Sequence, residues 1–387
     1  MKFTKFFAML SCAAMAFAAC EPVDDGKNPD NPNPGGNPGG TTSGELTLSA
    51  DKTAIELGES VTFTVEQKDE TTGELVDVTK DVTLYDADLN KLSNPFTPTT
   101  SGSINVTATK GKYTSNTVTV TVMAQMPELP ADTQPDNLAF NHRVVLIDHT
   151  GVNCGYCPEA TDNLIALSKT EWHQYYNEVT CHAGSFSTGD PANSAAANAL
   201  MQFQNSMISG YPTICLNFYS KAASRAVAAM KSALEANVKK DGADAGISLA
   251  VAGDNTTIYC AAQVKAKESK EYKVVAWLLE SGIYSPNQSG ATKDYHKIYN
   301  YAIRNISGEY SRNNVSGESI GVLEAGQTHD CAFSLPIVST KWNWEKMGVL
   351  VIVSAKDANN RWEVVNSAYC ALGEGGVAAS KPYEYVE

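Results

Sequence analysis

The sequence predicts a multidomain protein in which an all-β sandwich, a central α/β domain and a second β-sandwich follow one another. Apolar and polar residues alternate along residues 45–122 and again along 243–387, which is typical of strands with one buried face. Between these stretches, a continuous apolar run at 143–150 precedes residues with helical spacing. Strands that alternate with helices indicate an α/β layer, so three folded regions are expected.

The first region, residues 45–122, contains short segments rich in Thr and Val at intervals of about ten residues, such as "SVTFTVEQ" and "NTVTVTV". Turn residues separate them, which favours a small β-sandwich. The region resembles bacterial immunoglobulin-like domains. It has no cysteine, so packing alone must hold it together. A spacer role is expected, with ligand binding or adhesion as the alternative.

The second region, residues 137–242, alternates strands with helices. Its predicted strands are "RVVLIDHT", "NEVTCHAG" and "PTICLNF". Apolar residues with helical spacing follow these strands, and they form three stripes: Ala160, Leu164 and Leu167; Leu200, Phe203 and Met207; Val227, Met230 and Leu234.

Alternation returns in the third region, residues 243–387, with segments such as "GISLAV", "YKVVAWLLE" and "GVLVIVSA". They predict a second β-sandwich. The four tryptophans of this region are expected in its core rather than on a carbohydrate-binding platform: Trp277, Trp342, Trp344 and Trp362.

The first residues predict export and a lipid anchor. Lys2 and Lys5 precede the apolar run 6–19, which is too short to span a bilayer and is expected to be a signal peptide, residues 1–19. Small residues before Cys20 resemble a bacterial lipoprotein signal, in which Cys20 becomes the lipidated first residue. An ordinary secretory signal is the alternative. Residues 20–44, rich in Pro, Gly and Asn, and residues 123–136, with three prolines, are expected to be linkers.

Acidic residues directly after Cys20 resemble the surface-export signal of Bacteroidetes lipoproteins. They favour an outer-membrane lipoprotein on the cell surface, with a periplasm-facing anchor as the alternative. The formal net charge of −14 argues against nucleic acid as a partner, because an acidic surface repels phosphates. Export also means that thiols tend to oxidise.

The segment "GVNCGYCPEATDNL", residues 151–164, carries two cysteines two residues apart at the predicted start of a helix. A helix N-terminus lowers the pKa of a thiol, and this spacing lets the second sulfur resolve a mixed disulfide. Pro158 suits the first helical turn. The sequence therefore predicts Cys154 as an exposed attacking thiol and Cys157 as a more buried resolving thiol. A structural disulfide between them is the alternative.

Polar residues near this pair suggest further roles. Asp148, six residues before Cys154 in an apolar strand, is a candidate for proton transfer to the resolving thiol, or else a hydrogen-bonded carboxylate at a strand end. His149 and His182 could complete a zinc site, but there is no second CxxC and no metal is predicted. His149 is instead expected to line the site beside Asp148, and His182 to be a loop histidine.

Together, "VVLIDHTGVNCGYC" and "GYPTI" resemble the thioredoxin superfamily. The resemblance implies a cis peptide bond at Pro212 and a substrate-binding surface made by Tyr211, Pro212, Gly155 and Tyr156. CGYC also coincides with the motif of a periplasmic disulfide isomerase. The sequence has Asn153 where thioredoxins usually have tryptophan, and it has no room for the first strand–helix unit or the usual fifth strand. A trimmed thioredoxin-like domain is therefore expected.

A wider resemblance runs from about residue 140 to 372. The segments "LIDHTGVNCGYCPEATDNL", "CHAGSF", "GYPT" and "DYHKIYNYAIRN" resemble the Bacteroidetes twenty-eight-kilodalton outer-membrane protein family, here preceded by the immunoglobulin-like region. That family implies an exported, anchored, thioredoxin-like lipoprotein with a C-terminal β-domain.

The remaining cysteines are expected to be buried. Cys181 and Cys215 lie on strands predicted to flank the motif strand, too far apart to bridge, and are expected to be free thiols. Cys260 and Cys331 are in phase with inward-facing residues, so a bridge between them is open. Cys370 is the candidate unpaired residue.

Two functions follow as expectations. The first is an anchored thiol–disulfide oxidoreductase using Cys154, Cys157 and Asp148, with no bound cofactor. Its partners would be exported protein thiols or disulfides, or an electron-transfer protein. The second is a non-enzymatic surface lipoprotein with a structural disulfide, which binds a partner through its β-domains.

Overall fold

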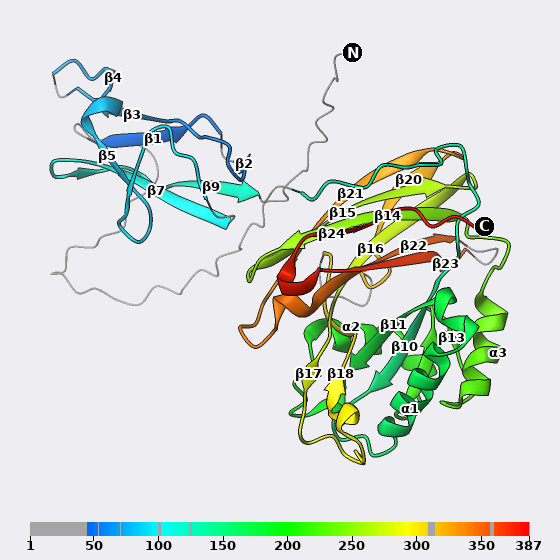
Figure 1. Cartoon of the computed structure of the whole chain (residues 1–387). Helices are drawn as coiled ribbons and strands as arrows, with labels where there is room; N and C mark the ends of the chain where they lie inside the picture. Colours follow the sequence, from blue (N-terminus) through cyan, green and yellow to red (C-terminus); the bar gives the residue numbers. More distant parts are fainter. Residues whose placement is uncertain are drawn as a thin grey trace, which may run out of the picture. The chain divides into compact units, whose positions relative to one another are not determined.

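The computed structural model describes residues 45–52, 54–69, 71–99, 102–123, 126–308, 314–356 and 360–386. The predicted signal peptide, Cys20 and the linker to residue 44 lie outside the described residues. The described chain is mostly β-sheet with few helices (Figure 1). This agrees with the predicted β-rich, multidomain chain.

The N-terminal strands lie within residues 45–123. They are β1 (Leu46–Ala50), β2 (Ala54–Glu56), β3 (Phe63–Lys68), β4 (Leu75–Asp77), β5 (Thr83–Tyr85), β6 (Lys91–Leu92), β7 (Gly102–Lys110), β8 (Tyr113–Thr114) and β9 (Val118–Met123), with a 3-10 turn at Thr79–Asp81. Strands β1, β3 and β4 form one antiparallel sheet. Strands β5, β6, β7 and β8 pair antiparallel, and β2 pairs parallel with β9.

The remaining elements lie within residues 126–386. The strands are β10 (Val144–Thr150), β11 (Tyr176–His182), β12 (Thr213–Leu216), β13 (Ser220–Lys221), β14 (Ala245–Gly253), β15 (Thr257–Ala266), β16 (Lys270–Glu280), β17 (Ile283–Tyr284), β18 (Ile298–Tyr299), β19 (Ala302–Ile306), β20 (Glu318–Leu323), β21 (Thr328–Pro336), β22 (Met347–Lys356), β23 (Trp362–Ala371) and β24 (Ala379–Lys381). The α-helices are α1 (Cys157–Ser168), α2 (Ala195–Phe203) and α3 (Val227–Asn237). Short 3-10 turns lie at Glu171–Tyr175, Ser185–Ser187, Asn205–Met207, Asp294–Lys297, Trp344–Lys346 and Glu374–Gly376.

One large sheet joins the central and C-terminal regions. Its strand order is β13-β12-β10-β11-β19-β16-β22-β23, with β20 also paired to β16. Strand β10 runs parallel to β11 and antiparallel to β12. Strand β11 also pairs in parallel with β19, through Thr180 and Ala302. The sheet therefore crosses the boundary predicted between residues 242 and 243, which separates the central from the C-terminal region.

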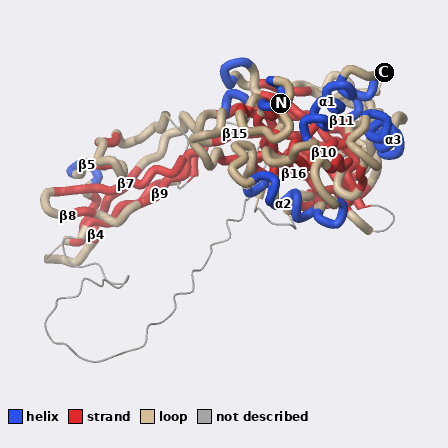
Figure 2. Tube along the Cα trace, turned by 90° about the horizontal axis from the view of Figure 1, so that it is seen from below, coloured by secondary structure: helices blue, strands red, loops and turns tan. Residues whose placement is uncertain are grey.

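Helices cover both faces of this sheet around β10 (Figure 2). Because side chains alternate along a strand, Val144 and Leu146 face α1 and α3, whereas Val145 and Ile147 face α2. The predicted stripe on α1 is buried. Leu200 on α2 is also buried, as are Met230 and Leu234 on α3. The helical spacing in the sequence therefore identified the packed faces.

The C-terminal strands form a sandwich, as Figure 1 shows. A second sheet of order β21-β15-β14-β24 packs its apolar side chains on the β16, β22 and β23 part of the large sheet. Trp277 is fully buried, and Trp342 and Trp344 pack against the sandwich core. Trp362 is half-buried, with the ammonium groups of Lys273 and Lys356 4.7 and 5.1 Å from its ring centre.

Part of the predicted second linker is fixed to the C-terminal sheet. The ammonium group of Lys265, only 3% exposed, pairs with Asp132 at 3.0 Å and donates to the carbonyl oxygen of Pro135. Tyr385 donates a hydrogen bond of 2.7 Å to the same Asp132 carboxylate. Phe140 then pairs with both Ala243 and Tyr385. The chain before β10 is thus held by side chains far away in the sequence.

Within the described part of the chain, none of the helices has the length and apolar character needed to cross a bilayer.

Candidate active site at the Cys154–Cys157 disulfide

Cys154 and Cys157 form a disulfide where β10 gives way to α1. Their Cα atoms are 5.5 Å apart. Cys157 is the first residue of α1, and Pro158 occupies the first turn, where a missing N–H leaves no hydrogen bond unmade. The second sulfur therefore lies at the positive end of the helix dipole, which favours a thiolate after reduction.

Both cysteines are buried, with exposures of 1% for Cys154 and 2% for Cys157. The prediction of an exposed attacking thiol is therefore wrong for this conformation. The residues between them do reach the surface, because Gly155 is exposed and Tyr156 has an exposure of 68%. Arg225 lies over the Tyr156 ring, 5.4 Å from its centre, and pairs with Glu159 on α1.

Residues 285–297, which we call the cap, pack against the loop that carries the two cysteines. The cap connects β17 to β18, and its backbone lies against the disulfide loop. The side-chain amide of Gln288 donates to the carbonyl oxygen of Cys154 at 3.1 Å. The backbone N–H of Ser289 donates to the carbonyl oxygen of Val152 at 2.8 Å. Gly290 has φ of +72°, and a Cβ atom there would overlap the carbonyl oxygen of Gly155.

The cap is also fastened to α1 through Asp162. This carboxylate accepts hydrogen bonds from Lys293 at 2.9 Å, from Tyr295 at 2.6 Å and from His296 at 3.0 Å. His296 accepts the backbone N–H of Thr292 on its Nδ1, so its Nε2 carries the proton that Asp162 accepts. The bonds from Tyr295, His296 and Lys293 lower the pKa of Asp162 well below its usual value.

Asp148 lies on β10 with its side chain on the α1 side of the sheet. It is 2% exposed, and its Oδ1 atom has no hydrogen-bond partner. Burial, together with the nearby carboxyl of Glu178, raises the pKa of Asp148 to about 8. The carboxyl is therefore mostly protonated at neutral pH, and it is not the hydrogen-bonded strand-end carboxylate of the alternative interpretation.

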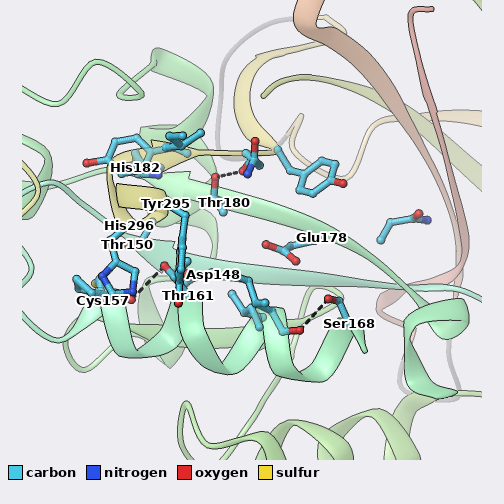
Figure 3. Close-up of a pocket in the computed structure, with 18 of the residues that line it drawn as sticks. Asp148, Thr150, Cys157, Thr161, Ser168, Glu178, Thr180, His182, Tyr295 and His296 are labelled. Atoms are coloured by element: carbon cyan, nitrogen blue, oxygen red, sulfur yellow. Dashed lines mark hydrogen bonds between the residues drawn. The ribbon is translucent and has the colours of Figure 1, made fainter. Parts of the chain in front are cut away.

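A cavity of about 550 Å³ lies between the sheet, α1 and the cap (Figure 3). Asp148, Cys157, Glu178 and His182 all line it. Glu178 comes from β11, and burial raises its pKa to about 7. Figure 3 shows Asp148 and Glu178 above α1, on the same side of the sheet. Volumes of this size are typical of sites for small molecules.

The two histidines, His149 and His182, lie on opposite faces of the large sheet. His149 pairs across the sheet with Cys181, so it points to the opposite face from His182. Its Nε2 is 2.7 Å from Gln204, and burial lowers its pKa to about 4. Among the described residues, no three His, Cys, Asp or Glu side chains gather as metal ligands.

His182 is not a loop histidine, which corrects the prediction. It is the last residue of β11 and is buried. Its Nδ1 lies 2.8 Å from Asp190, whose carboxylate also accepts the backbone N–H of Val152. Burial opposes ionisation of Asp190, but the hydrogen bond and charge of His182 lower its pKa overall. Asp190 thus links His182 to the loop that carries the disulfide.

The Tyr211–Pro212 peptide bond is cis, as expected. The Tyr211 hydroxyl donates to the carbonyl oxygen of Ala183 at 3.0 Å. Its ring lies 5.2 Å from that of Phe186 and 6.4 Å from His149. Pro212 is half-buried and directly precedes β12.

The other described cysteines are free thiols. Cys181 and Cys215 lie on β11 and β12, on either side of β10, and both are buried as predicted. Cys260 and Cys370 are buried and Cys331 is half-buried in the C-terminal sandwich. All three are free thiols, and the possible bridge between Cys260 and Cys331 is not formed. Burial raises the pKa of Cys331 to about 12 and that of Cys215 to about 12, which keeps these thiols unreactive.

The family model described as outer membrane protein Omp28 matches residues 200–374, a range that begins after the disulfide and includes the cap. The match supports the resemblance to that family. No curated protein matches the chain.

Two solved structures from Porphyromonas gingivalis are similar to the chain. One, HBP35, is 15% identical; the match covers 60% of this chain and 76% of that one, with a TM-score of 0.49. The other, a domain of the outer membrane lipoprotein Omp28, is 16% identical; the match covers 34% of this chain and 90% of that one, with a TM-score of 0.22.

Proposed function

We propose that this protein is an exported, lipid-anchored, thioredoxin-like protein that exchanges thiols and disulfides with other exported proteins. One observation carries the proposal: the Cys154–Cys157 disulfide begins α1, and Cys157 lines the same cavity as the buried carboxyl of Asp148. A helix N-terminus favours a thiolate, and a buried acid can hold the proton that a thiol gains or loses.

The exchange begins with the oxidised pair. A thiolate of the substrate protein attacks Sγ of Cys154 and forms a mixed disulfide, while Cys157 leaves as a thiolate. Asp148, protonated at neutral pH because of its raised pKa, gives its proton to Cys157. A second substrate thiolate then attacks the substrate sulfur of the mixed disulfide. This step releases the oxidised substrate and leaves Cys154 reduced. The reverse sequence reduces a substrate disulfide.

Four residues form the proposed substrate-binding surface: Tyr211, Pro212, Gly155 and Tyr156. Gly155 and Tyr156 are exposed between the cysteines, and Tyr211 and Pro212 are half-buried just before β12. The side chain of Tyr156 and exposed backbone at Gly155 suit contact with an extended peptide. Because Cys154 itself is buried, a substrate thiolate reaches its sulfur only after the cap moves away from the disulfide loop.

The reduction potential of the pair tests this proposal. We expect a value between about −120 and −270 mV, the range of proteins that exchange disulfides. The control is Cys331→Ser, which removes a half-buried free thiol and leaves the potential unchanged. Cys154→Ser removes one of the two sulfur atoms, so the variant should show no disulfide–dithiol equilibrium at this site. A potential below about −300 mV, with loss of stability on reduction, contradicts the proposal.

The burial of both sulfur atoms favours a second candidate, in which the disulfide is structural and the β-domains bind a partner. This candidate requires the very low potential described above. It also requires that the oxidised full-length chain fail to oxidise a reduced substrate protein under conditions in which the cap is open. Turnover of protein thiols under those conditions contradicts it.

The match to the Omp28 family supports an outer-membrane location, and the predicted lipid on Cys20 is the proposed anchor. We place the protein on the cell surface, with the immunoglobulin-like region as a spacer. Protease added to intact cells should cleave it. If the protein stays uncut until the outer membrane is opened, the anchor faces the periplasm.

A further inference from the structure

The cavity beside the disulfide contains two carboxyl groups that have no basic partner among the described residues. Asp148 and Glu178 both line it, and neither forms a salt bridge within the described part of the chain. Asp148 is 2% exposed and its Oδ1 has no hydrogen-bond partner. A buried polar atom without a partner is rare and calls for an explanation, such as a ligand that the site is built to hold.

The basic groups around the cavity are already committed elsewhere. Arg143 forms two hydrogen bonds to Glu384, at 2.9 and 3.0 Å. His182 pairs with Asp190 through Nδ1, and His296 pairs with Asp162. The exposed His173 has its Nδ1 at 2.9 Å from the carbonyl oxygen of Thr170. None of these pairs neutralises Asp148 or Glu178.

The two carboxyls lie on neighbouring parallel strands. Asp148 pairs with Thr180, and Glu178 lies two residues before Thr180 on the same face. From the usual strand spacing and rise, their Cα atoms are about 8 Å apart. Three tyrosines complete the wall: Tyr176 on β11, Tyr299 on β18 and Tyr369 on β23. Aromatic rings attract organic cations as well as apolar groups.

We propose that this cavity binds a small organic diammonium ion whose two charged groups pair with Asp148 and Glu178. The cation supplies the counter-charge for the two carboxyls in their ionised form, and the tyrosines surround its carbon chain. A bare metal ion fits less well, because the space of about 550 Å³ is far larger than an ion and the described residues present no cluster of three ligands. The site does not depend on disulfide exchange.

Calorimetric titration of the full-length oxidised protein tests the proposal. The probe is 1,4-diaminobutane, and the matched neutral compound is butane-1,4-diol. At pH 8.5 most carboxyls of this cavity are ionised, while the diamine keeps its charge. We expect saturable binding of the diamine, at least about tenfold tighter than that of the diol. Equal binding of the two compounds, or no binding of the diamine, overturns the proposal.

A charge-removing variant assigns the binding to the cavity. Glu178→Gln should weaken diamine binding by about tenfold or more, whereas Glu235→Gln, on the exposed side of α3, should leave it unchanged. Unchanged binding in folded Glu178→Gln overturns the proposal. If that variant does not fold, the pH dependence of diamine binding to the wild-type protein tests the proposal instead. Its affinity should fall at least about tenfold between pH 8.5 and 6, and a flat profile overturns the proposal.

Discussion

Asp148 is held in an environment that disfavours its charge. It comes from a strand whose every residue is buried, and no hydrogen bond reaches its Oδ1. Burial and the Glu178 carboxyl raise its pKa to about 8. A group with such a pKa can release and take up a proton near neutral pH, which is the property that a proton donor to a leaving thiolate needs.

Replacing Asp148 by Asn should slow the reaction of the disulfide with glutathione. With rates expressed per glutathione thiolate, we expect a loss on the order of 100-fold at pH 7, because Asn cannot protonate the departing Cys157. The wild-type rate should fall as pH rises through about 8, and the variant should lack this inflection. Stopped-flow kinetics measure both.

Asp136→Asn is the control, because Asp136 is exposed in the segment before β10. It should retain the wild-type profile. An Asp148→Asn protein with the same rate and inflection as wild type would mean that another group protonates Cys157.

The raised pKa values also predict how stability depends on pH. The unfolded chain releases the protons of Asp148 and Glu178 near pH 4, whereas the folded protein holds them to about pH 8 and 7. Their stabilising contribution is therefore complete below pH 4 and is lost as pH rises to 8. The double variant Asp148→Asn, Glu178→Gln should flatten this decline by up to about 6 kcal/mol between pH 5 and 8. Urea unfolding measures the difference, and parallel curves for the two proteins would refute it.

The sequence identified Asp148 because an acidic residue stands out in an apolar strand. Glu178 was missed because its strand also carries Asn177, Thr180 and His182, so a carboxyl there does not stand out from its neighbours. The burial of Cys154 could not be predicted, since Gln288, which contacts it, is 134 residues away in the sequence. Local patterns report the polarity of a position but not which distant segment covers it.

Among the elements, the cap is expected to control access to the disulfide. Its hydrogen bonds to Val152 and Cys154 hold the loop, and Asp162 holds the cap on α1. The Asp162 contacts lie at the surface, where individual hydrogen bonds and ion pairs are weak. Transient opening of the cap is therefore expected to precede any reaction of the disulfide.

Asp162→Ala should increase the rate at which dithiothreitol reduces the pair. The variant removes the acceptor for Lys293, Tyr295 and His296 together, so open conformations become more populated. We expect a rate about three- to tenfold higher, measured by alkylation and mass spectrometry at fixed times.

The control for charge is Asp294→Ala, since Asp294 is fully exposed in the cap and forms a loose ion pair of 3.6 Å with Lys297. It should leave the rate unchanged. Gly290→Ala, whose Cβ would overlap the Gly155 carbonyl oxygen, should increase the rate as Asp162→Ala does. If neither variant reacts faster than wild type, the cap does not control access.

The helices were predictable because their apolar residues repeat with helical spacing, as Leu164 and Leu167 do on α1. The order of the strands was not. Strand β19 joins β11 through the single pair Thr180 and Ala302, and nothing in either segment specifies this partner. Long-range pairing depends on the whole packed structure.

For the molecule as a whole, the large sheet makes residues 137–242 and 243–386 interdependent. Strands β10, β11 and β12 come from the first range and β16, β19, β22 and β23 from the second, in one hydrogen-bonded sheet. Asn366 on β23 further donates to the carbonyl oxygens of Asn141 and Ala245. Separating the ranges would expose the unpaired edges of β11 and β19 to solvent.

We therefore expect residues 126–386 to unfold in a single cooperative transition. Calorimetry measures the unfolding transitions of the full-length protein. A chain that ends at residue 123 identifies the transition of the N-terminal region, so the remaining heat absorption belongs to residues 126–386. A fragment comprising 243–387 alone should be aggregated or unfolded. Two separate transitions within 126–386, or a soluble folded fragment with native-like near-ultraviolet circular dichroism, would contradict the expectation.

Membrane attachment is the remaining prediction at this scale. Cys20→Ser removes the proposed lipid acceptor, and we expect the variant to move from the membrane pellet to the soluble fraction after cell lysis, because no other anchor is predicted from the sequence. Immunoblots of the two fractions measure the change. A variant that remains in the pellet points to a different anchor or to a tightly bound partner.

The free cysteines have a practical consequence for chemical labelling. Among the described residues, Cys181, Cys215, Cys260 and Cys370 are buried in the packed sheets, and burial raises the pKa of the half-buried Cys331 to about 12, so these five thiols react slowly as long as the chain stays folded. Iodoacetamide applied under native conditions after mild reduction should therefore mark Cys154 and Cys157 first, because opening of the cap is expected to expose them without unfolding of the sheets. Denaturant then reveals the others, so the order of modification distinguishes opening of the cap from unfolding of the sheets within one sample.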